Sequence, residues 1–225
     1  MIALHNIIKK YENRVVLNNI NISFDKGLNI IIGRSGSGKT TLLNIIGTLE
    51  NPTIGSVLIE GEDINTLNDK KINKMRNEKI GFVFQSFYLE PRYTVLENVA
   101  LPLALQKINK NLKKEKCLEA LKKVDMLSFS DKLTATLSGG EMQRVCIARA
   151  IINEPAIILA DEPCGNLDYK TGNIIMDLLR QLANEGKCVI LVTHNQEHLK
   201  YADRVIEILD GEIINEYIQD PSKGD

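Results

Sequence analysis

The chain has 225 residues, 44% of them hydrophobic and 25% charged, which suits one globular domain with a sizeable core. Its 28 basic and 29 acidic residues give a net charge of −1, which argues against a protein that works on nucleic acid or on an anionic membrane surface. No apolar run reaches the ~18 residues of a membrane-spanning helix, and we expect no secretory signal, because Met1 leads directly into a strand pattern. We therefore expect a cytoplasmic chain whose four cysteines are reduced and mostly buried.

The first third of the chain predicts two kinds of strand. Residues 2–8 and 15–24 alternate apolar and polar side chains around the polar turn Glu12-Asn13, which predicts antiparallel strands with one buried face. Residues 29–32 are instead a short continuous apolar run, typical of a parallel strand buried on both faces. Residues 41–49 then have the spacing of a helix.

The rest of the chain predicts an α/β fold. Further elements are expected in this order: strands at 57–59 and 80–84, helical spacing from 94 to about 153, a strand at 156–160, a helix at 171–184, a strand at 189–192, and a hairpin of 205–209 with 212–217. Asp210-Gly211 suits a type I′ turn in that hairpin. Apolar strands that alternate with helices imply a parallel sheet. We predict one domain over residues 1–225, with an antiparallel β subdomain near the start and a helical subdomain inserted at about 86–153.

A glycine-rich segment lies between the predicted strand 29–32 and the predicted helix 41–49. It fits the pattern G-x-x-x-x-G-K-[ST] without a gap, with the residues Gly33, Arg34, Ser35, Gly36, Ser37, Gly38, Lys39 and Thr40. Backbone N–H groups and the positive end of the helix can surround phosphate oxygens there. Lys39 supplies a cation for the outer phosphates, and the Thr40 hydroxyl is a ligand for Mg²⁺.

Two other interpretations of this segment are weaker. A dinucleotide pattern that starts at Gly36 would need a glycine at position 41, which is Thr41. A Gly/Ser-rich turn with a chance lysine would have to match eight ordered positions in the correct strand–helix context. We therefore predict that residues 33–41, Thr41 included, bind a nucleoside triphosphate.

An acidic pair ends the predicted strand 156–160. Asp161 would stand at the carboxyl end of a buried strand, where its carboxylate can hold Mg²⁺. Glu162, one residue further, is a candidate general base for an attacking water. Two solvated acids at a strand end are the alternative, which the neighbouring phosphate-loop prediction makes weaker.

The segment Leu137-Ser138-Gly139-Gly140-Glu141 discriminates among proteins with phosphate loops. Ser138 and Glu141 form an S-x-x-E capping box that opens a helix to about Ile152, and two glycines leave its backbone amides open to an anion. The segment resembles the LSGGQ signature of ABC (ATP-binding cassette) ATPases, which belong to the RecA-like P-loop NTPase class. The resemblance implies that Ser138 and Gly140, with Gly139 between them, bind the γ-phosphate of the ATP held by the other subunit of a head-to-tail homodimer.

The resemblance also assigns roles outside these motifs. Gln85 matches the glutamine that senses Mg²⁺ and the lytic water, so it is both a catalytic and a metal candidate. His194 matches the histidine that contacts the γ-phosphate and joins Glu162 and Lys39 as a catalytic candidate; a satisfied core histidine is the alternative. Residues 166–168 match the D-loop at the dimer interface. Tyr11 matches the aromatic that stacks on adenine; a plain strand-end tyrosine is the alternative.

The segments 81–87, 91–92 with 94–99, and 160–163 with 165–168 resemble those of the ATPases of macrolide exporters and lipoprotein-release machines. This implies a separately encoded membrane permease, a place at the inner face of the cell membrane through that permease, export of a lipid, peptide or drug-like substrate, and no nucleic-acid partner. A regulatory ATPase that signals through a membrane partner is the alternative, and a cassette acting on DNA or ribosomes is disfavoured by the near-neutral charge.

Tyr88, Tyr93 and Cys164 depart from the family pattern. We expect residues 85–93, the docking segment, to receive a short helix of the permease.

Overall fold

The computed structural model describes residues 1–219, which fall into two compact units. The first unit comprises residues 1–76 and 179–219, and the second comprises residues 77–178. Two helices cross the division along the chain, α2 (Asp69–Lys79) and α6 (Tyr169–Asn184). The helical insertion expected at about 86–153 lies within the second unit, and the single-domain organisation remains a prediction. No helix of the described part of the chain combines the length and the apolar character needed to cross a membrane.

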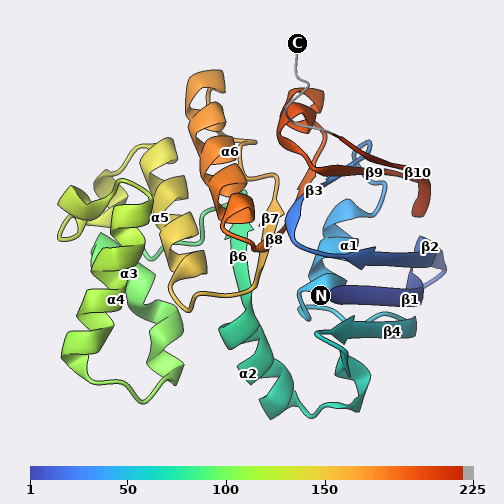
Figure 1. Cartoon of the computed structure of the whole chain (residues 1–225), viewed down its shortest axis with the longest axis horizontal. Helices are drawn as coiled ribbons and strands as arrows, with labels where there is room; N and C mark the ends of the chain where they lie inside the picture. Colours follow the sequence, from blue (N-terminus) through green and yellow to red (C-terminus); the bar gives the residue numbers. More distant parts are fainter. Residues whose placement is uncertain (220–225) are drawn as a thin grey trace. The chain divides into compact units, whose positions relative to one another are not determined.

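An antiparallel sheet opens the first unit. Its strand order is β2-β1-β4-β5, with the bounds β1 (Ile2–Tyr11), β2 (Arg14–Phe24), β4 (Ile54–Ile59) and β5 (Glu62–Asp63). Strands β1, β2 and β4 run side by side (Figure 1). The side chains of Ile2, Leu4 and Ile7 are buried, as the alternating pattern predicts for a strand with one apolar face. The antiparallel prediction is confirmed, and β1 extends three residues further than expected, to Tyr11.

A second group of strands in the first unit carries the phosphate loop. Its order is β10-β9-β3-β8, with β3 (Gly27–Ile32), β8 (Cys188–Thr193), β9 (Arg204–Leu209) and β10 (Glu212–Ile218), and β10 is antiparallel to β9. Strand β3 pairs in parallel with both β8 and β9, so it is buried between strands that follow it by more than 150 residues along the chain. Helix α1 (Lys39–Ile46) starts directly after the loop and packs against β8. It ends before the predicted Leu49 because the Gly47 N–H closes its last turn on Leu43 and the chain turns away.

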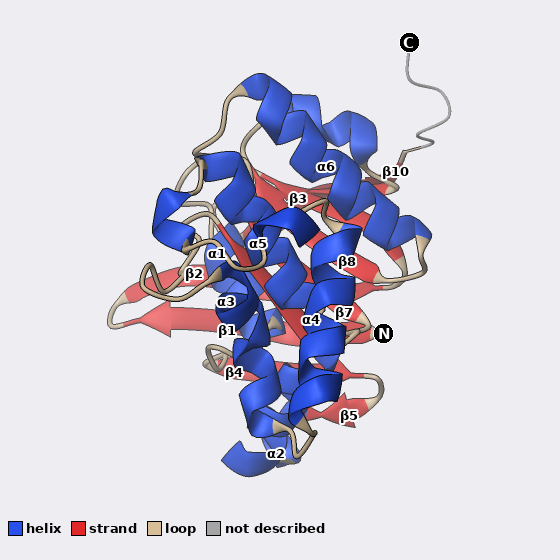
Figure 2. Ribbon diagram, turned by 90° about the vertical axis from the view of Figure 1, so that its left-hand side faces the viewer, coloured by secondary structure: helices blue, strands red, loops and turns tan. Residues whose placement is uncertain are grey.

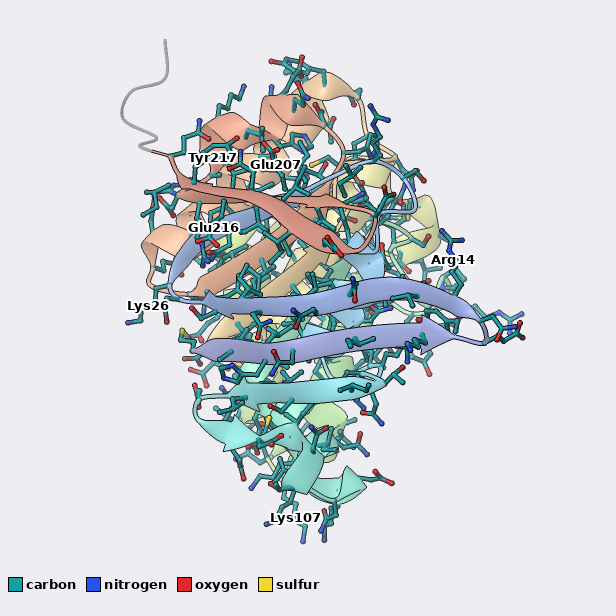
Figure 3. All side chains as sticks on the ribbon, turned by 90° about the vertical axis from the view of Figure 1, so that its right-hand side faces the viewer. Arg14, Lys26, Lys107, Glu207, Glu216 and Tyr217 are labelled. Atoms are coloured by element: carbon teal, nitrogen blue, oxygen red, sulfur yellow. The ribbon has the colours of Figure 1, made fainter. Side chains whose placement is uncertain are left out.

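The hairpin of β9 and β10 forms as its turn residues predict. Asp210 and Gly211 have φ values of 47° and 80°, both left-handed, as a type I′ turn requires. Figure 3 labels Glu207 on β9 and Glu216 and Tyr217 on β10, and it labels Arg14 at the turn end of the β1–β2 hairpin. Arg14 pairs with Tyr11 across that hairpin.

The second unit combines two parallel strands with a group of helices. Strand β6 (Ile80–Phe84) pairs in parallel with β7 (Ile157–Asp161). Its other elements are α3 (Val95–Ala100), α4 (Lys110–Lys123), α5 (Gly139–Ile151) and the short 3₁₀ helices at Leu101–Leu105, Leu127–Phe129 and Thr134–Thr136. Helices α3, α4 and α5 pack together (Figure 2), and α5 packs against β6.

The sequence patterns missed four elements: α2, β5 and the two 3₁₀ helices at Ile64–Thr66 and Gln196–Tyr201. Helix α2 buries only one apolar side chain, that of Met75, so it has no apolar stripe by which periodicity could identify it. Strand β5 has two residues, which is too short for an alternating pattern.

Candidate nucleotide-binding site

The phosphate loop joins β3 to α1 in the first unit and encloses the side chain of Lys39. Lys39 is 7% exposed, and its Nζ donates to the carbonyl oxygens of Gly33 at 2.8 Å and Arg34 at 2.9 Å. The carbonyls of the loop thus hold an ammonium group inside the loop's own curve. A cation fixed in this way needs little reorganisation to meet the outer phosphates of a nucleotide.

The glycines of the loop are required by its geometry. A Cβ on Gly33 would lie 2.3 Å from the Ile208 carbonyl oxygen and 2.7 Å from Ser37 Oγ, so no other residue fits there. Gly38 has a φ of 98° and is the N-cap of α1, and within residues 1–219 no side chain caps that helix. No capping side chain of the described residues therefore occupies the positive end of α1, which is where helices bind phosphate oxygens.

A buried hydroxyl also points to a ligand at this loop. Ser37 is 4% exposed, and its Oγ has no hydrogen-bond partner among the described residues. Buried polar atoms without a partner are rare, because each costs the free energy of its lost hydration. Together with the uncapped helix start, this atom fits a loop built to bind phosphate oxygens.

His194 lies beside the phosphate loop at the carboxyl edge of the parallel strands. Ile32 and Thr193 are register partners in β3 and β8, so the residues that follow them, Gly33 and His194, leave the sheet next to each other. This edge is where open parallel sheets bind ligands. The side chain of His194 is exposed, whereas His198 is buried with its Nδ1 3.4 Å from Thr193 Oγ1.

The acidic pair and Gln85 come together in the second unit. Phe84 and Asp161 are register partners in β6 and β7, so Gln85 and Glu162 follow at the same edge. Gln85 Nε2 donates to Asn166 Oδ1 at 3.4 Å, and Asn166 Nδ2 donates to the Gln85 carbonyl at 3.2 Å. Glu162 has a left-handed φ of 43°, a conformation that is costly for a non-glycine residue and recurs at functional sites.

The signature segment forms the predicted capping box. Ser138 is the N-cap of α5: its N–H and its Oγ both donate to Glu141 Oε2 at 2.7 Å, and Glu141 N–H donates back to Ser138 Oγ at 3.4 Å. The hydrogen bond from the Ser138 N–H is the main cause that lowers the pKa of Glu141 below its usual value. Glu141 is therefore a carboxylate at neutral pH and keeps the box closed.

The two signature glycines lie against the start of α6. A Cβ on Gly140 would be 2.2 Å from Thr171 Cγ2, and a Cβ on Gly139 would be 3.3 Å from Leu167 Cδ2. Thr171 is itself fixed, since its Oγ1 donates to Asp168 Oδ2 at 2.6 Å. The signature segment and the D-loop segment 166–168 are thus packed together in one unit, which the sequence spacing alone did not reveal.

The docking segment is partly exposed and is clamped from α5. Tyr88 is 69% exposed and Tyr93 is 44% exposed, whereas Phe87 is half-buried. Arg149 donates to the carbonyl oxygens of Tyr88 at 2.6 Å and Phe87 at 2.7 Å. Sequence reasoning missed Arg149, because nothing in its local pattern distinguishes it from a solvated arginine of a helix.

Cys164 is buried against the start of α6 and is not set up for thiol chemistry. Its Sγ lies 3.5 Å from the Gly172 carbonyl oxygen. Burial, helped by the negative charge of Glu162, raises the pKa of the thiol to about 12. The nucleophilic form of cysteine is the thiolate, so Cys164 serves as a small packing residue.

The candidate residues therefore form two sets. The first unit holds Tyr11, His194 and residues 33–41; the second holds Gln85, Asp161, Glu162 and residues 138–140. A buried parallel strand that leads through this loop into an uncapped helix defines the class of the protein as a P-loop nucleoside triphosphatase.

Comparison with known proteins identifies the family within this class. Residues 17–165 match the family model described as ABC transporter. The chain is 44% identical over 219 residues to the uncharacterized ABC transporter ATP-binding protein YvrO of Bacillus subtilis, covering 95% of this chain and 96% of that one. It is also 44% identical over 220 residues to the macrolide export ATP-binding/permease protein MacB of Campylobacter jejuni, of which it covers 34%.

A solved structure agrees with the sequence relatives. The dimeric structure of MJ0796, a bacterial ABC transporter cassette by its description, superposes with a TM-score of 0.89 at 43% identity, over 97% of this chain and 98% of that one. The same protein has been seen as a dimer in a post-hydrolysis state bound to ADP and Pi, with a TM-score of 0.87. The chain therefore belongs to the ABC transporter family, as an ATP-binding subunit that is an ATPase. The resemblance and the fold class expected from the sequence are confirmed.

Proposed function

We propose that the chain hydrolyses ATP to power a separately encoded membrane permease that exports a lipid, peptide or drug-like substrate. The identity to MacB supports this, because the name of that protein joins an ATP-binding part to a permease and to macrolide export. The observation that carries the proposal is the phosphate loop, with its enclosed Lys39 and uncapped helix start. In this role the chain lies in the cytoplasm, at the inner face of the membrane through its permease.

We infer that the two sets of residues have different tasks in binding and hydrolysing ATP. The N–H groups of residues 33–41 and the ammonium of Lys39 hold the phosphates. Thr40, Gln85 and Asp161 offer hydroxyl, amide and carboxylate oxygens, the hard donors that Mg²⁺ prefers, and Mg²⁺ bound there would neutralise phosphate charge. Glu162 accepts the proton of the attacking water, and His194 contacts the γ-phosphate.

The signature residues Ser138, Gly139 and Gly140 serve the nucleotide of a second subunit. Their helix start offers backbone amides to an anion, and a head-to-tail homodimer in the ATP-bound state would bring each signature segment to the other subunit's phosphate loop. The dimers seen for MJ0796 support this arrangement. The docking segment, with its exposed Tyr88, then receives the permease.

Replacement of the candidate base tests the proposal. Glu162→Gln keeps the size of the side chain but cannot accept a proton, so it should bind MgATP, lose about 10²- to 10⁴-fold in turnover and accumulate as an ATP-bound dimer. Glu154→Gln is the matched control, since Glu154 is an exposed glutamate of the same unit with a similar left-handed φ of 53°. ATPase rate and molecular mass are measured with and without MgATP. Wild-type turnover of Glu162→Gln, or a monomer at saturating ATP, would refute the proposed site.

A further inference from the structure

The hydroxyl of Tyr11 is tied to two other parts of the first unit. It donates a hydrogen bond to the carboxylate of Glu50, 39 residues further along the chain. The Thr41 side chain, in the first turn of α1, interacts with the same hydroxyl and acts to lower its pKa, against the larger effects of burial and Glu50. One hydroxyl therefore connects the end of β1 to the residue that follows the phosphate loop and to the segment after α1.

Lys9 completes the arrangement around the ring. Its Nζ lies 2.9 Å from Glu50 Oε1, donates to the Asn51 carbonyl at 2.7 Å, and is 5.0 Å from the centroid of the Tyr11 ring. Lys9 and Glu50 are mostly buried, with side chains 13% and 23% exposed, whereas Tyr11 is 44% exposed. A cation over one face of the ring leaves the opposite face for a ligand.

The hydrogen bond from the Tyr11 hydroxyl to Glu50 is called the tether below. Its acceptor, Glu50, is itself fixed by the backbone. The N–H groups of Leu49 and Glu50 both donate to the Asn44 carbonyl, at 2.9 and 3.3 Å. A few residues later, Thr53 Oγ1 accepts from the Lys10 N–H at 2.9 Å, which joins the segment after α1 to the end of β1. Glu50 is therefore part of a pinned connection between α1 and β1.

The protonation states at neutral pH keep the tether in place. Burial, with the hydrogen bond to Glu50, raises the pKa of Tyr11, so the phenol remains a donor. Burial alone would raise the pKa of Glu50, but the hydrogen bonds from Tyr11 and Lys9 outweigh it and lower that pKa. Donor and acceptor are thus both available across the physiological range.

We propose that Glu50, supported by Lys9, is a positioning residue for nucleotide binding: it holds the Tyr11 ring as a one-sided stacking platform at a set distance from the phosphate loop. This inference rests on the proposed function, in which Tyr11 stacks on the base. The base and phosphates of a nucleotide are joined through one ribose, so the platform and the loop must keep a matching separation. An untethered tyrosine would have to be ordered when the nucleotide binds, which weakens affinity by about 2- to 10-fold.

The tether also limits what the platform can recognise. The Tyr11 hydroxyl and the Glu50 carboxylate bond to each other, so they are engaged away from the hydrogen-bonding edge of a base. Stacking reads a π-surface that every purine has. ATP and GTP should therefore compete, with discrimination well below the ~10³ that would require polar recognition of the base.

The test separates the base platform from the phosphate loop. Dissociation constants are measured for ATP, GTP and inorganic tripolyphosphate, together with the thermal midpoint. Tyr11→Phe and Glu50→Ala should each weaken ATP and GTP about 2- to 10-fold and leave tripolyphosphate unchanged, because the loop is intact. Glu50→Gln should recover most of the loss, since its amide oxygen still accepts from the phenol. Glu216→Ala, at a residue labelled in Figure 3, is the control. It breaks the ion pair with Arg204 at 2.8 Å in the same unit and should leave the affinity for all three ligands unchanged.

Each outcome decides one step of the inference. Equal weakening of tripolyphosphate and ATP by Glu50→Ala would overturn the positioning role, since the defect would then lie in the loop. If Tyr11→Ala weakens ATP but Tyr11→Phe and Glu50→Ala do not, the tether is wrong while stacking stands. If Tyr11→Ala leaves ATP and GTP affinity unchanged, the stacking role in the proposed function is wrong.

Discussion

Gly140 provides a test of why the signature segment contains glycine at this position. An added Cβ would lie 2.2 Å from Thr171 Cγ2, whereas carbon atoms in ordinary contact are about 3.5–4.0 Å apart. Thr171 cannot simply rotate its methyl group away, because its Oγ1 donates to Asp168 at 2.6 Å and its N–H donates to the same carboxylate at 3.0 Å. Gly140→Ala should therefore force the starts of α5 and α6 apart or break this cap.

The size of the effect follows from two opposing contributions. Overpacking of this kind costs about 1–3 kcal/mol, while the better helix propensity of alanine returns about 1 kcal/mol. We expect Gly140→Ala to lower the free energy of unfolding by about 0–2 kcal/mol. For a chain of this length that corresponds to a thermal midpoint lowered by roughly 0–8 °C.

A second substitution gives the sharper result. Thr171→Ser removes the methyl group that the new Cβ would meet and keeps the hydroxyl that bonds Asp168. In the wild-type background it should cost at most about 0.8 kcal/mol, the free energy of one buried methyl group. In the Gly140→Ala background it should instead stabilise the protein, because it relieves the clash.

Thermal midpoints of the wild type, the two single variants and the double variant complete the cycle. A Thr171→Ser change that lowers the midpoint equally in both backgrounds would refute the packing explanation. The double variant also separates two roles of the glycine. If Gly140 contacts the partner's nucleotide as proposed, the double variant should regain stability but still dimerise poorly with MgATP.

Three further predictions follow from the structure. Lys39→Ala should abolish MgATP turnover, because it removes the ammonium enclosed by the loop; ATPase activity at the wild-type rate would contradict the site. Tyr88→Asp should leave nucleotide binding unchanged but remove the stimulation of ATPase activity by the permease. Tyr88 is exposed and has a left-handed φ of 48°, which aspartate tolerates, so the variant should fold. Normal stimulation of the assembled complex would show that the docking site lies elsewhere. Burial raises the pKa of Cys146, Cys164 and Cys188 from 9.0 to about 12, so these thiols should resist iodoacetamide at pH 9 until the chain is unfolded. The stability that the protonated thiols contribute is complete below pH 9 and should fall as the pH rises towards 12.

Features set by neighbouring residues could be predicted from the sequence. The phosphate loop, the Ser138–Glu141 capping box and the Asp210-Gly211 turn all formed as their patterns indicated. Each depends on contacts between residues only a few positions apart, so a short window of sequence contains both partners. Strand positions were predicted for a similar reason, since an apolar run or an alternating pattern directly reflects one or two buried faces.

Contacts between distant parts of the chain were decided only by the tertiary structure. The Tyr11–Glu50 hydrogen bond spans 39 residues, and the Arg149–Phe87 bond spans 62. No local pattern marks either pair, because a tyrosine, glutamate or arginine looks the same in sequence whether it is solvated or clamped. The positions of β8 and β9 on either side of β3 are of the same kind, since they depend on which buried faces pack best over the whole unit. The local sequence thus determined the chemistry of the phosphate loop, and long-range packing determined which residues position the side chains around it.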